Sequence, residues 1–143
     1  MTTISASLSG AIEAGAQLPP VQIPAISRTT LALFAGASGD HNPMHIDIDV
    51  ARSAGLQDVF SHGMLSMAYL GRVLTNWADQ RAIRSYRVRF VAITPVHAQI
   101  TCAGTVLALE DEDGERRARI ALTATLADGT VTLQGDAVIA LGS

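Results

Sequence analysis

A polar loop in the first third of the chain carries residue types that can move protons. Asp40 and His45 flank the dipeptide Asn42-Pro43, and proline restricts the backbone of the turn, so the two side chains can converge. A carboxylate and an imidazole around a gap of one water molecule can remove one proton and deliver another, as hydration of a double bond requires. An imidazole suits this role because its ordinary pKa lies near neutral pH. The loop therefore predicts general acid–base chemistry.

Three other interpretations of this loop remain open from residue types alone. Asp40 can accept a hydrogen bond within its own turn, as Asx turns do, and His45 can be a half-buried structural side chain. A metal site formed by Asp40, His41 and His45 is the third, but these residues lack helical spacing and a second cluster of ligands. We therefore expect no metal and no other cofactor.

A second candidate site is the tripeptide His62-Gly63-Met64, which begins an apolar helical pattern. The first N–H groups of a helix have no partner within the helix and carry the positive end of its dipole. Glycine at this point lets a ligand approach the backbone closely. The amide of Gly63 can then polarise a carbonyl oxygen as an oxyanion hole. The structural alternative is that His62 and Gly63 only form the start of the helix.

The longest helical pattern in the chain follows directly on Gly63. Apolar side chains recur every three or four residues at Met67, Leu70, Leu74 and Trp77, and the pattern runs to about residue 79. Because apolar residues cover most of its circumference, we expect this helix to be buried. Before it we expect an irregular segment over 1–20, an edge strand over 21–26, a helix from Ser27 or Thr29 to about 36–39, an extended piece over 44–48 and a short helix over 49–54.

The second half of the chain changes to a period of two, which is typical of strands. Apolar and polar residues alternate over 86–92, 100–106, 117–124 and 131–139, and Asp-Gly turns separate the last three segments. We therefore expect an antiparallel meander of four strands. A long buried helix followed by such a sheet is an α+β arrangement in which the sheet wraps the helix, as in the hotdog fold.

Composition excludes several classes of protein. The chain has 143 residues, of which 48% are hydrophobic and 16% charged, and its net charge is −3, so we expect a single domain over 1–143. All ten basic residues are Arg and form no basic run, which predicts no nucleic-acid binding and excludes lysine chemistry. The apolar stretches are too short to span a membrane, and residues 1–10 lack a basic leader segment. With Cys102 as the one cysteine, expected to be a small buried side chain, these features predict a cytoplasmic protein.

The loop and the start of the long helix together resemble the MaoC-like family, which comprises (R)-specific enoyl thioester hydratases (hydratase 2) of hotdog fold. The resemblance rests on Phe-Ala-x-x-Ser-Gly-Asp-x-Asn-Pro-x-His-x-Asp at 34–47 and on His-Gly-Met at 62–64, and it covers roughly residues 10–141. In length and in its Ser-Gly-Asp motif the chain is most similar to the catalytic subunit of (3R)-hydroxyacyl-ACP dehydratases. The resemblance implies reversible hydration of trans-2-enoyl thioesters of CoA or acyl-carrier protein to (3R)-hydroxyacyl thioesters in fatty acid metabolism.

The same resemblance implies a role for individual residues. Asp40 and His45 match the catalytic pair that activates one water molecule, and Gly63 matches the residue whose amide polarises the thioester carbonyl. The expected substrate-binding residues are Asn42, which also braces the loop, His62 and Met64.

Two positions depart from the family pattern. Several relatives carry a serine on the long helix where this chain has Gly71, and many carry a proline where it has Ile48. We expect Ser66 to lie on a different face of the helix from that serine, so it is given no role. Four arginines follow the helix and either meet the phosphates of the carrier or form a solvated strand face: Arg81, Arg84, Arg87 and Arg89.

The partner and two rival functions follow from the same family. An unpaired sheet edge favours association, and the resemblance implies a dimer, either a homodimer or a heterodimer with another hotdog subunit. A hotdog thioesterase is one alternative, but no Asp or Glu lies between Gly63 and Ala78, where such enzymes usually carry a carboxylate. A non-catalytic acyl-binding subunit is the other, and it would be expected to have lost Asp40 or His45.

Overall fold

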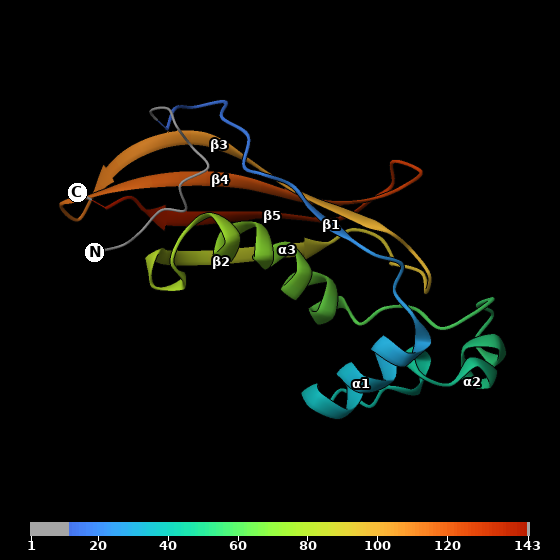
Figure 1. Cartoon of the computed structure of the whole chain (residues 1–143). Coiled ribbons are helices and arrows are strands. Elements are labelled where there is room, and N and C mark those ends of the chain that lie inside the picture. Colours follow the sequence, from blue (N-terminus) through green and yellow to red (C-terminus); the bar gives the residue numbers. More distant parts are fainter. Residues whose placement is uncertain (1–11, 143) are drawn as a thin grey trace.

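The computed structural model describes residues 12–142, which form an antiparallel sheet with a long helix packed on one side (Figure 1). The first eleven residues of the predicted irregular segment lie outside the described residues. None of the helices within 12–142 has the length and apolar character needed to span a bilayer. The elements in chain order are β1 (Val21–Ile23), α1 (Arg28–Ser38), the 3-10 helix η1 (Pro43–His45), α2 (Ile48–Ser53), α3 (Gly63–Trp77), the 3-10 helix η2 (Gln80–Ala82), β2 (Ile83–Phe90), β3 (Ile100–Glu112), β4 (Glu115–Leu126) and β5 (Val131–Ala140).

The five strands lie in the order β1-β3-β4-β5-β2. Strands β3, β4 and β5 form the predicted meander, and Asp113 and Gly114 turn β3 into β4 with φ of 55° and 75°, as a tight hairpin requires. The prediction of a four-strand meander is wrong for β2, which pairs with β5 instead of β3. The free edge of β3 is occupied by β1, with Val21 opposite Cys102, so the edge of β5 is the one left for β2.

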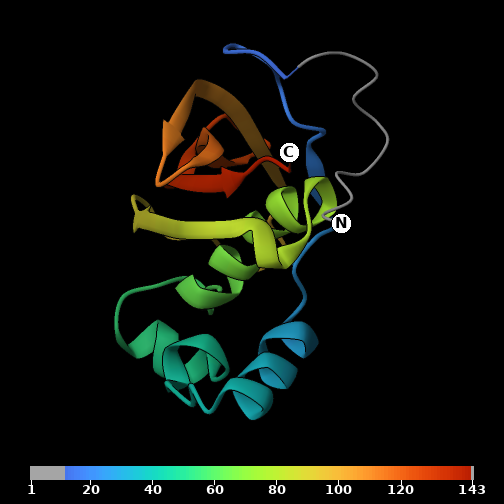
Figure 2. The same ribbon diagram turned by 90° about the vertical axis from the view of Figure 1, so that its left-hand side faces the viewer.

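Helix α3 lies against the inner face of the sheet, which curves around it (Figures 1 and 2). Leu70, Val73 and Leu74 of this helix are fully buried and belong to one apolar core with residues of the strands, among them Ile120 and Cys102. Burying one such side chain stabilises the fold by about 1.5–3 kcal/mol. This is the predicted hotdog arrangement, and Cys102 is the predicted small buried side chain.

Residues 28–62, which we call the helical arm, extend from the start of α3 away from the sheet (Figure 1). Local hydrogen bonds define its helices. Ser27 caps α1 by accepting from the amide of Thr30 at 3.0 Å, and Gly39 ends α1 in the left-handed conformation with φ of 77°. Asp47 caps α2 by accepting from the amide of Asp49 at 2.9 Å, so the aspartate that ends the 34–47 motif has a structural role.

The arm contains one departure from the expected elements. Residues 44–48 were predicted to be extended, but Pro43–His45 form a 3-10 turn and Ile48 already belongs to α2. The side chain of Asn42 accepts a hydrogen bond from the amide of Met44 at 3.1 Å, which caps that turn. Asn42 and Asp47 are two capping side chains close together in the sequence, and they favour helical turns over 43–53. The residue types of this segment alone do not determine whether it is helical or extended.

Candidate active site

Asp40 lies in a tight loop directly after α1. The amide of Asn42 donates to Oδ1 of Asp40 at 3.3 Å, and the amide of Asp40 donates to the hydroxyl of Ser38 at 3.2 Å. One carboxylate oxygen of Asp40, Oδ1, therefore accepts the hydrogen bond of an Asx turn, as the structural interpretation expects. The residue is exposed, and a carboxylate oxygen lies within 4.8 Å of ring nitrogens of His45 and His62, so the carboxylate can meet a ligand there.

His45 sits two residues beyond Pro43 and is only 6% exposed. Its Nδ1 lies 2.8 Å from the carbonyl oxygen of Phe60, and because a carbonyl can only accept, Nδ1 carries the proton. The ring also packs edge-on against the ring of Phe60, with centroids 4.7 Å apart. The imidazole is thus fixed in one orientation with the lone pair on Nε2, where it can accept a proton.

His62 lies beneath this loop and is fully buried. Its ring is 4.1 Å from that of His45 at a tilt of 32°, and the ring of Phe34 contacts it edge-on at 4.8 Å. Nε2 of His62 donates to the backbone carbonyl of Asp40 at 3.2 Å, while Nδ1 has no hydrogen-bond partner. His62 therefore holds the backbone of Asp40 against the start of α3.

Burial lowers the pKa of His62 below its usual 6.5, and the positive charge that His45 can carry lowers it further. A protonated His62 would place a second N–H, on Nδ1, in the core without an acceptor. The neutral form is therefore favoured, which leaves Asp40 and His45 as the groups that can exchange protons.

A carboxylate oxygen of Asp40 and ring nitrogens of His45 and His62 all lie within 4.8 Å of one another. One water molecule that makes two ordinary hydrogen bonds spans roughly 4.6 Å between its partners, so these groups are close enough to share a single water. One carboxylate and two imidazoles are also a ligand set that Zn²⁺ accepts. Each ring donates one nitrogen's proton to a carbonyl, which leaves its other nitrogen free for a proton or a ligand. The exposed His41 of the predicted metal interpretation is not in the cluster.

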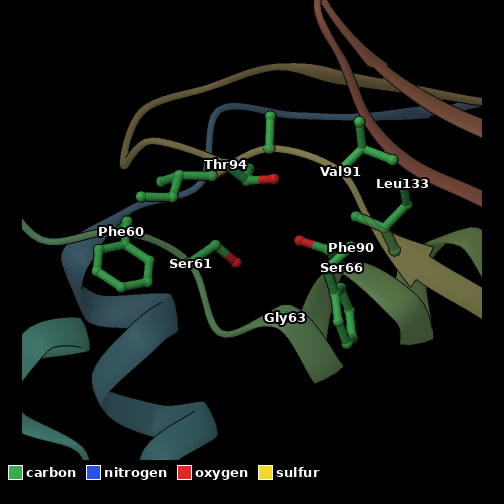
Figure 3. Close-up of a pocket in the computed structure, with 10 residues that line it drawn as sticks. Phe60, Ser61, Gly63, Ser66, Phe90, Val91, Thr94 and Leu133 are labelled. Atoms are coloured by element: carbon green, nitrogen blue, oxygen red, sulfur yellow. The ribbon is translucent and has the colours of Figure 1, made fainter.

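The first turn of α3 borders a cavity of about 310 Å³ (Figure 3). Its N-cap residue His62 makes no side-chain hydrogen bond to the helix. A Cβ on Gly63 would lie 3.0 Å from the ring of Phe90, so glycine permits this close approach at the cavity wall. The lining residues are Phe60, Ser61, Gly63, Ser66, Phe90, Val91, Ala92, Ile93, Thr94 and Leu133.

The positions of Met64 and Ser66 relative to the cavity differ from what their sequence interpretation suggests. Met64, predicted to bind substrate, is 57% exposed and is not among the residues that line this cavity. Ser66, which was given no role, lines it and is 1% exposed, with no hydrogen-bond partner for its hydroxyl. The signal that could have found Ser66 is a polar residue one turn after Gly63 inside an otherwise apolar stripe.

The arginines after α3 mostly form surface ion pairs. Arg81 pairs with Asp79 at 3.0 Å, Arg84 with Glu115 at 2.6 Å, and Arg87 with Asp136 at 2.9 Å. Their charges are partly satisfied within the protein, which favours the solvated strand face over a phosphate site.

The chain belongs to the MaoC-like domain family: the family model described as "MaoC like domain" matches residues 11–128. It is 32% identical over 116 residues to an (R)-specific enoyl-CoA hydratase of Rhodospirillum rubrum, which covers 80% of this chain and 78% of that protein. It is 27% identical over 92 residues to 3-hydroxyacyl-thioester dehydratase Z of Mycobacterium tuberculosis, which covers 60% of this chain and 61% of that protein.

Solved structures share the fold over nearly the whole described chain. A MaoC-like dehydratase superposes with a TM-score of 0.83 at 29% identity, covering 92% of this chain and 41% of that one. The (R)-hydratase from A. caviae involved in PHA biosynthesis gives 0.78 at 23% identity, covering 94% and 100%. A chain of the ChsH1-ChsH2 complex from Mycobacterium tuberculosis gives 0.79 at 21%, covering 92% and 100%. At these last two identities the likeness establishes the fold.

Proposed function

We propose that this protein is a hydro-lyase that interconverts trans-2-enoyl thioesters and (3R)-3-hydroxyacyl thioesters. The observation that carries the proposal is the pairing of the Asp40 carboxylate with a buried His45, close enough to share one water molecule. The similarity to a protein named (R)-specific enoyl-CoA hydratase, at 32% identity over 80% of the chain, supports the same reaction.

In the hydration direction, the water loses a proton to one member of the Asp40–His45 pair as its oxygen forms a bond to C3 of the enoyl thioester. The π electrons shift toward the thioester carbonyl to form an enolate, and the other member of the pair, which begins the reaction protonated, gives its proton to C2. The N–H of Gly63 donates to the thioester oxygen and stabilises the negative charge that develops there. A proton transfer between the two side chains restores their starting states, and dehydration is the reverse.

The other predicted residues support this pair in different ways. Asn42 holds the loop by capping η1 through the amide of Met44. His62 holds the carbonyl of Asp40 and is best described as a positioning residue, since its side chain is fully buried. Met64 offers an exposed apolar side chain beside Gly63, where a thioester substrate would lie.

The working form of the protein is proposed to be a dimer, with a second copy or with another hotdog subunit. Strand β2 is an edge strand, and an apolar patch next to it is exposed: Met64, Phe90, Val91 and Ile93 are 48–57% accessible. An edge strand beside such a patch is a site of association. The molar mass of the purified chain in solution distinguishes a homodimer from a subunit that awaits a different partner.

The proposed reaction is tested by following the enoyl absorbance of short and long trans-2-enoyl-CoA substrates. Asp40→Asn and His45→Ala are each expected to lose at least about a hundredfold in kcat, because each removes one of the proton-transfer groups. Asp49→Asn changes an exposed carboxylate in the first turn of α2 and serves as the matched control. A stereospecific dehydrogenase reports whether the product is (3R).

The alternatives give different results in this assay. Free thiol release from a saturated acyl-CoA would favour a thioesterase. A folded, dimeric wild type that binds acyl-CoA or acyl-carrier-protein thioesters without hydrating either would contradict the proposal and favour the acyl-binding subunit.

A further inference from the structure

The first turn of α3 presents two hydrogen-bond donors at the wall of one cavity. Gly63 is the first residue of the helix, so its N–H has no partner within the helix, and His62 before it provides no side-chain cap. Ser66 lines the same cavity and is 1% exposed, yet its hydroxyl has no hydrogen-bond partner. Figure 3 shows the hydroxyl of Ser66 pointing into the cavity, toward that of Ser61.

Helical geometry brings the Ser66 hydroxyl close to the Gly63 amide. Residues three apart lie on the same side of a helix, one turn above the other. Side chains also lean toward the N-terminus of their helix, so the side chain of Ser66 lies over the turn that Gly63 begins. A single oxygen atom in the cavity can therefore face both donors.

The proton of the Ser66 hydroxyl is not committed elsewhere. Serines within helices commonly donate to the carbonyl four residues earlier, which here belongs to His62. That carbonyl instead accepts the amide of Ser66 at 3.2 Å and the hydroxyl of Ser61 at 3.2 Å. The indole Nε1 of Trp77 also lacks a partner, but it lies in the apolar core at the other end of the helix, away from the cavity.

We propose that Ser66 is a catalytic residue, the second donor of the oxyanion site, and that its O–H and the Gly63 N–H together bind the thioester carbonyl oxygen. The proposal rests on the function proposed above. Ser66 keeps its proton throughout, and its hydrogen bond strengthens as the carbonyl oxygen gains negative charge during attack at C3. A buried hydroxyl that finds no partner within the described protein then obtains one from the substrate.

The kinetic test compares Ser66→Ala and Ser66→Cys with the wild type on trans-2-butenoyl-CoA. Loss of one oxyanion donor typically lowers kcat about a hundredfold to a thousandfold, and we expect Ser66→Ala to fall in this range with a smaller change in KM. Ser66→Cys keeps the shape of the side chain but has only a weak S–H donor, so it is expected to lose at least about tenfold. Thr75→Ala removes a hydroxyl from the exposed last turn of α3 and should retain full activity.

Thermal unfolding separates this role from a structural one. Because the hydroxyl has no partner within the described protein, removing it relieves a buried unpaired group, so the Tm of Ser66→Ala should equal or exceed that of the wild type. A lowered Tm with a parallel loss of active protein would show that Ser66 is structural and would overturn the proposal.

A spectroscopic readout does not depend on turnover. The carbonyl stretch of bound ¹³C-labelled butyryl-CoA, which is saturated and cannot be hydrated, should lie at lower frequency in the wild type than in Ser66→Ala. If the wild type hydrates no substrate but this difference is present, the proposed reaction fails while the assignment of Ser66 stands. Equal carbonyl frequencies together with unchanged kcat in Ser66→Ala would overturn the assignment alone.

Discussion

The helical arm and the helix–sheet body of this protein differ in their balance of polar contacts and apolar burial, although Leu31, Ala51 and Val59 of the arm join the same core. In the arm, single side chains fix each turn: Asn42 caps η1, and His62 holds the carbonyl of Asp40. In the body, residues 63–140, side chains such as Leu74 and Ile120 are fully buried in one continuous apolar core. The arm thus carries polar groups in defined positions, while the body supplies most of the apolar burial.

This difference predicts that chemistry and stability can be separated by substitution. Changes at the polar groups of the arm should reduce turnover far more than they reduce the free energy of unfolding. Changes in the apolar core should do the reverse.

The largest effect is expected for His45→Gln. The amide can still donate to the carbonyl of Phe60, but it cannot take up and release a proton near neutral pH. We expect kcat for enoyl-CoA hydration to fall by about a hundredfold to ten-thousandfold. Steady-state kinetics measure it, with circular dichroism to verify folding. If the variant kept more than a tenth of the wild-type kcat, His45 would not be one of the proton-transfer groups, and the arm would not carry the chemistry as proposed.

In the body, Leu74→Ala should destabilise the fold without touching the site. Leu74 is fully buried, and removing its methyl groups leaves a cavity that costs about 2–5 kcal/mol of unfolding free energy. Urea unfolding measures the change. The matched control is Leu33→Ala in the arm, where the side chain is 70% exposed and the cost should stay within about 0.5 kcal/mol. Equal costs at the two leucines would contradict the claim that burial in the core sets the cost.

A smaller effect is expected for Asn42→Ala, which removes the cap of η1. Loss of such a cap costs about 1 kcal/mol, and here it also loosens the loop between Asp40 and His45. We therefore expect a modest loss of stability with a larger relative loss of kcat. Asn76→Ala, in an exposed position on α3, should change neither. Wild-type kcat in Asn42→Ala would show that the cap does not position the pair.

The smallest effect concerns the pH dependence of stability. Because burial lowers the pKa of His62 in the folded protein below its usual 6.5, the unfolded chain binds more protons in the window between the two values. This contribution is fully present above the unfolded pKa and is lost as pH falls toward the folded pKa. Between pH 7.5 and 5.5, Tm should fall more in the wild type than in His62→Gln, which keeps a donor for the Asp40 carbonyl. Parallel curves would show that His62 does not titrate this way.

The sequence predicts the body better than the arm because apolar periodicity reports burial directly. The period of α3 and the alternation of β3 to β5 follow from the side chains that the core must bury. The position of β2 does not, because its own residues fit either free edge and the choice depends on β1 occupying the edge of β3.

The candidate site was predictable where one motif contains it and hidden where contacts are long-range. Asp40 and His45 are close in sequence, and the structure brings them together. The hydrogen bond from His62 to the carbonyl of Asp40 joins residues 22 positions apart, so residue types could not reveal it. The cavity wall at Ser66 depends on Phe90 and the residues after it, which reach α3 only in the folded chain.

We propose that the arm performs acid–base chemistry and that the stability of the body does not depend on the groups that carry it out. Asp40→Asn tests it most directly, because Asp40 is exposed and the substitution preserves its size and its Asx turn. The initial rate of enoyl-CoA hydration and the Tm should be measured on the same preparation. The account predicts a rate at least about a hundredfold lower with a Tm within about 2 °C of the wild type. A variant that hydrates the substrate at the wild-type rate would contradict it.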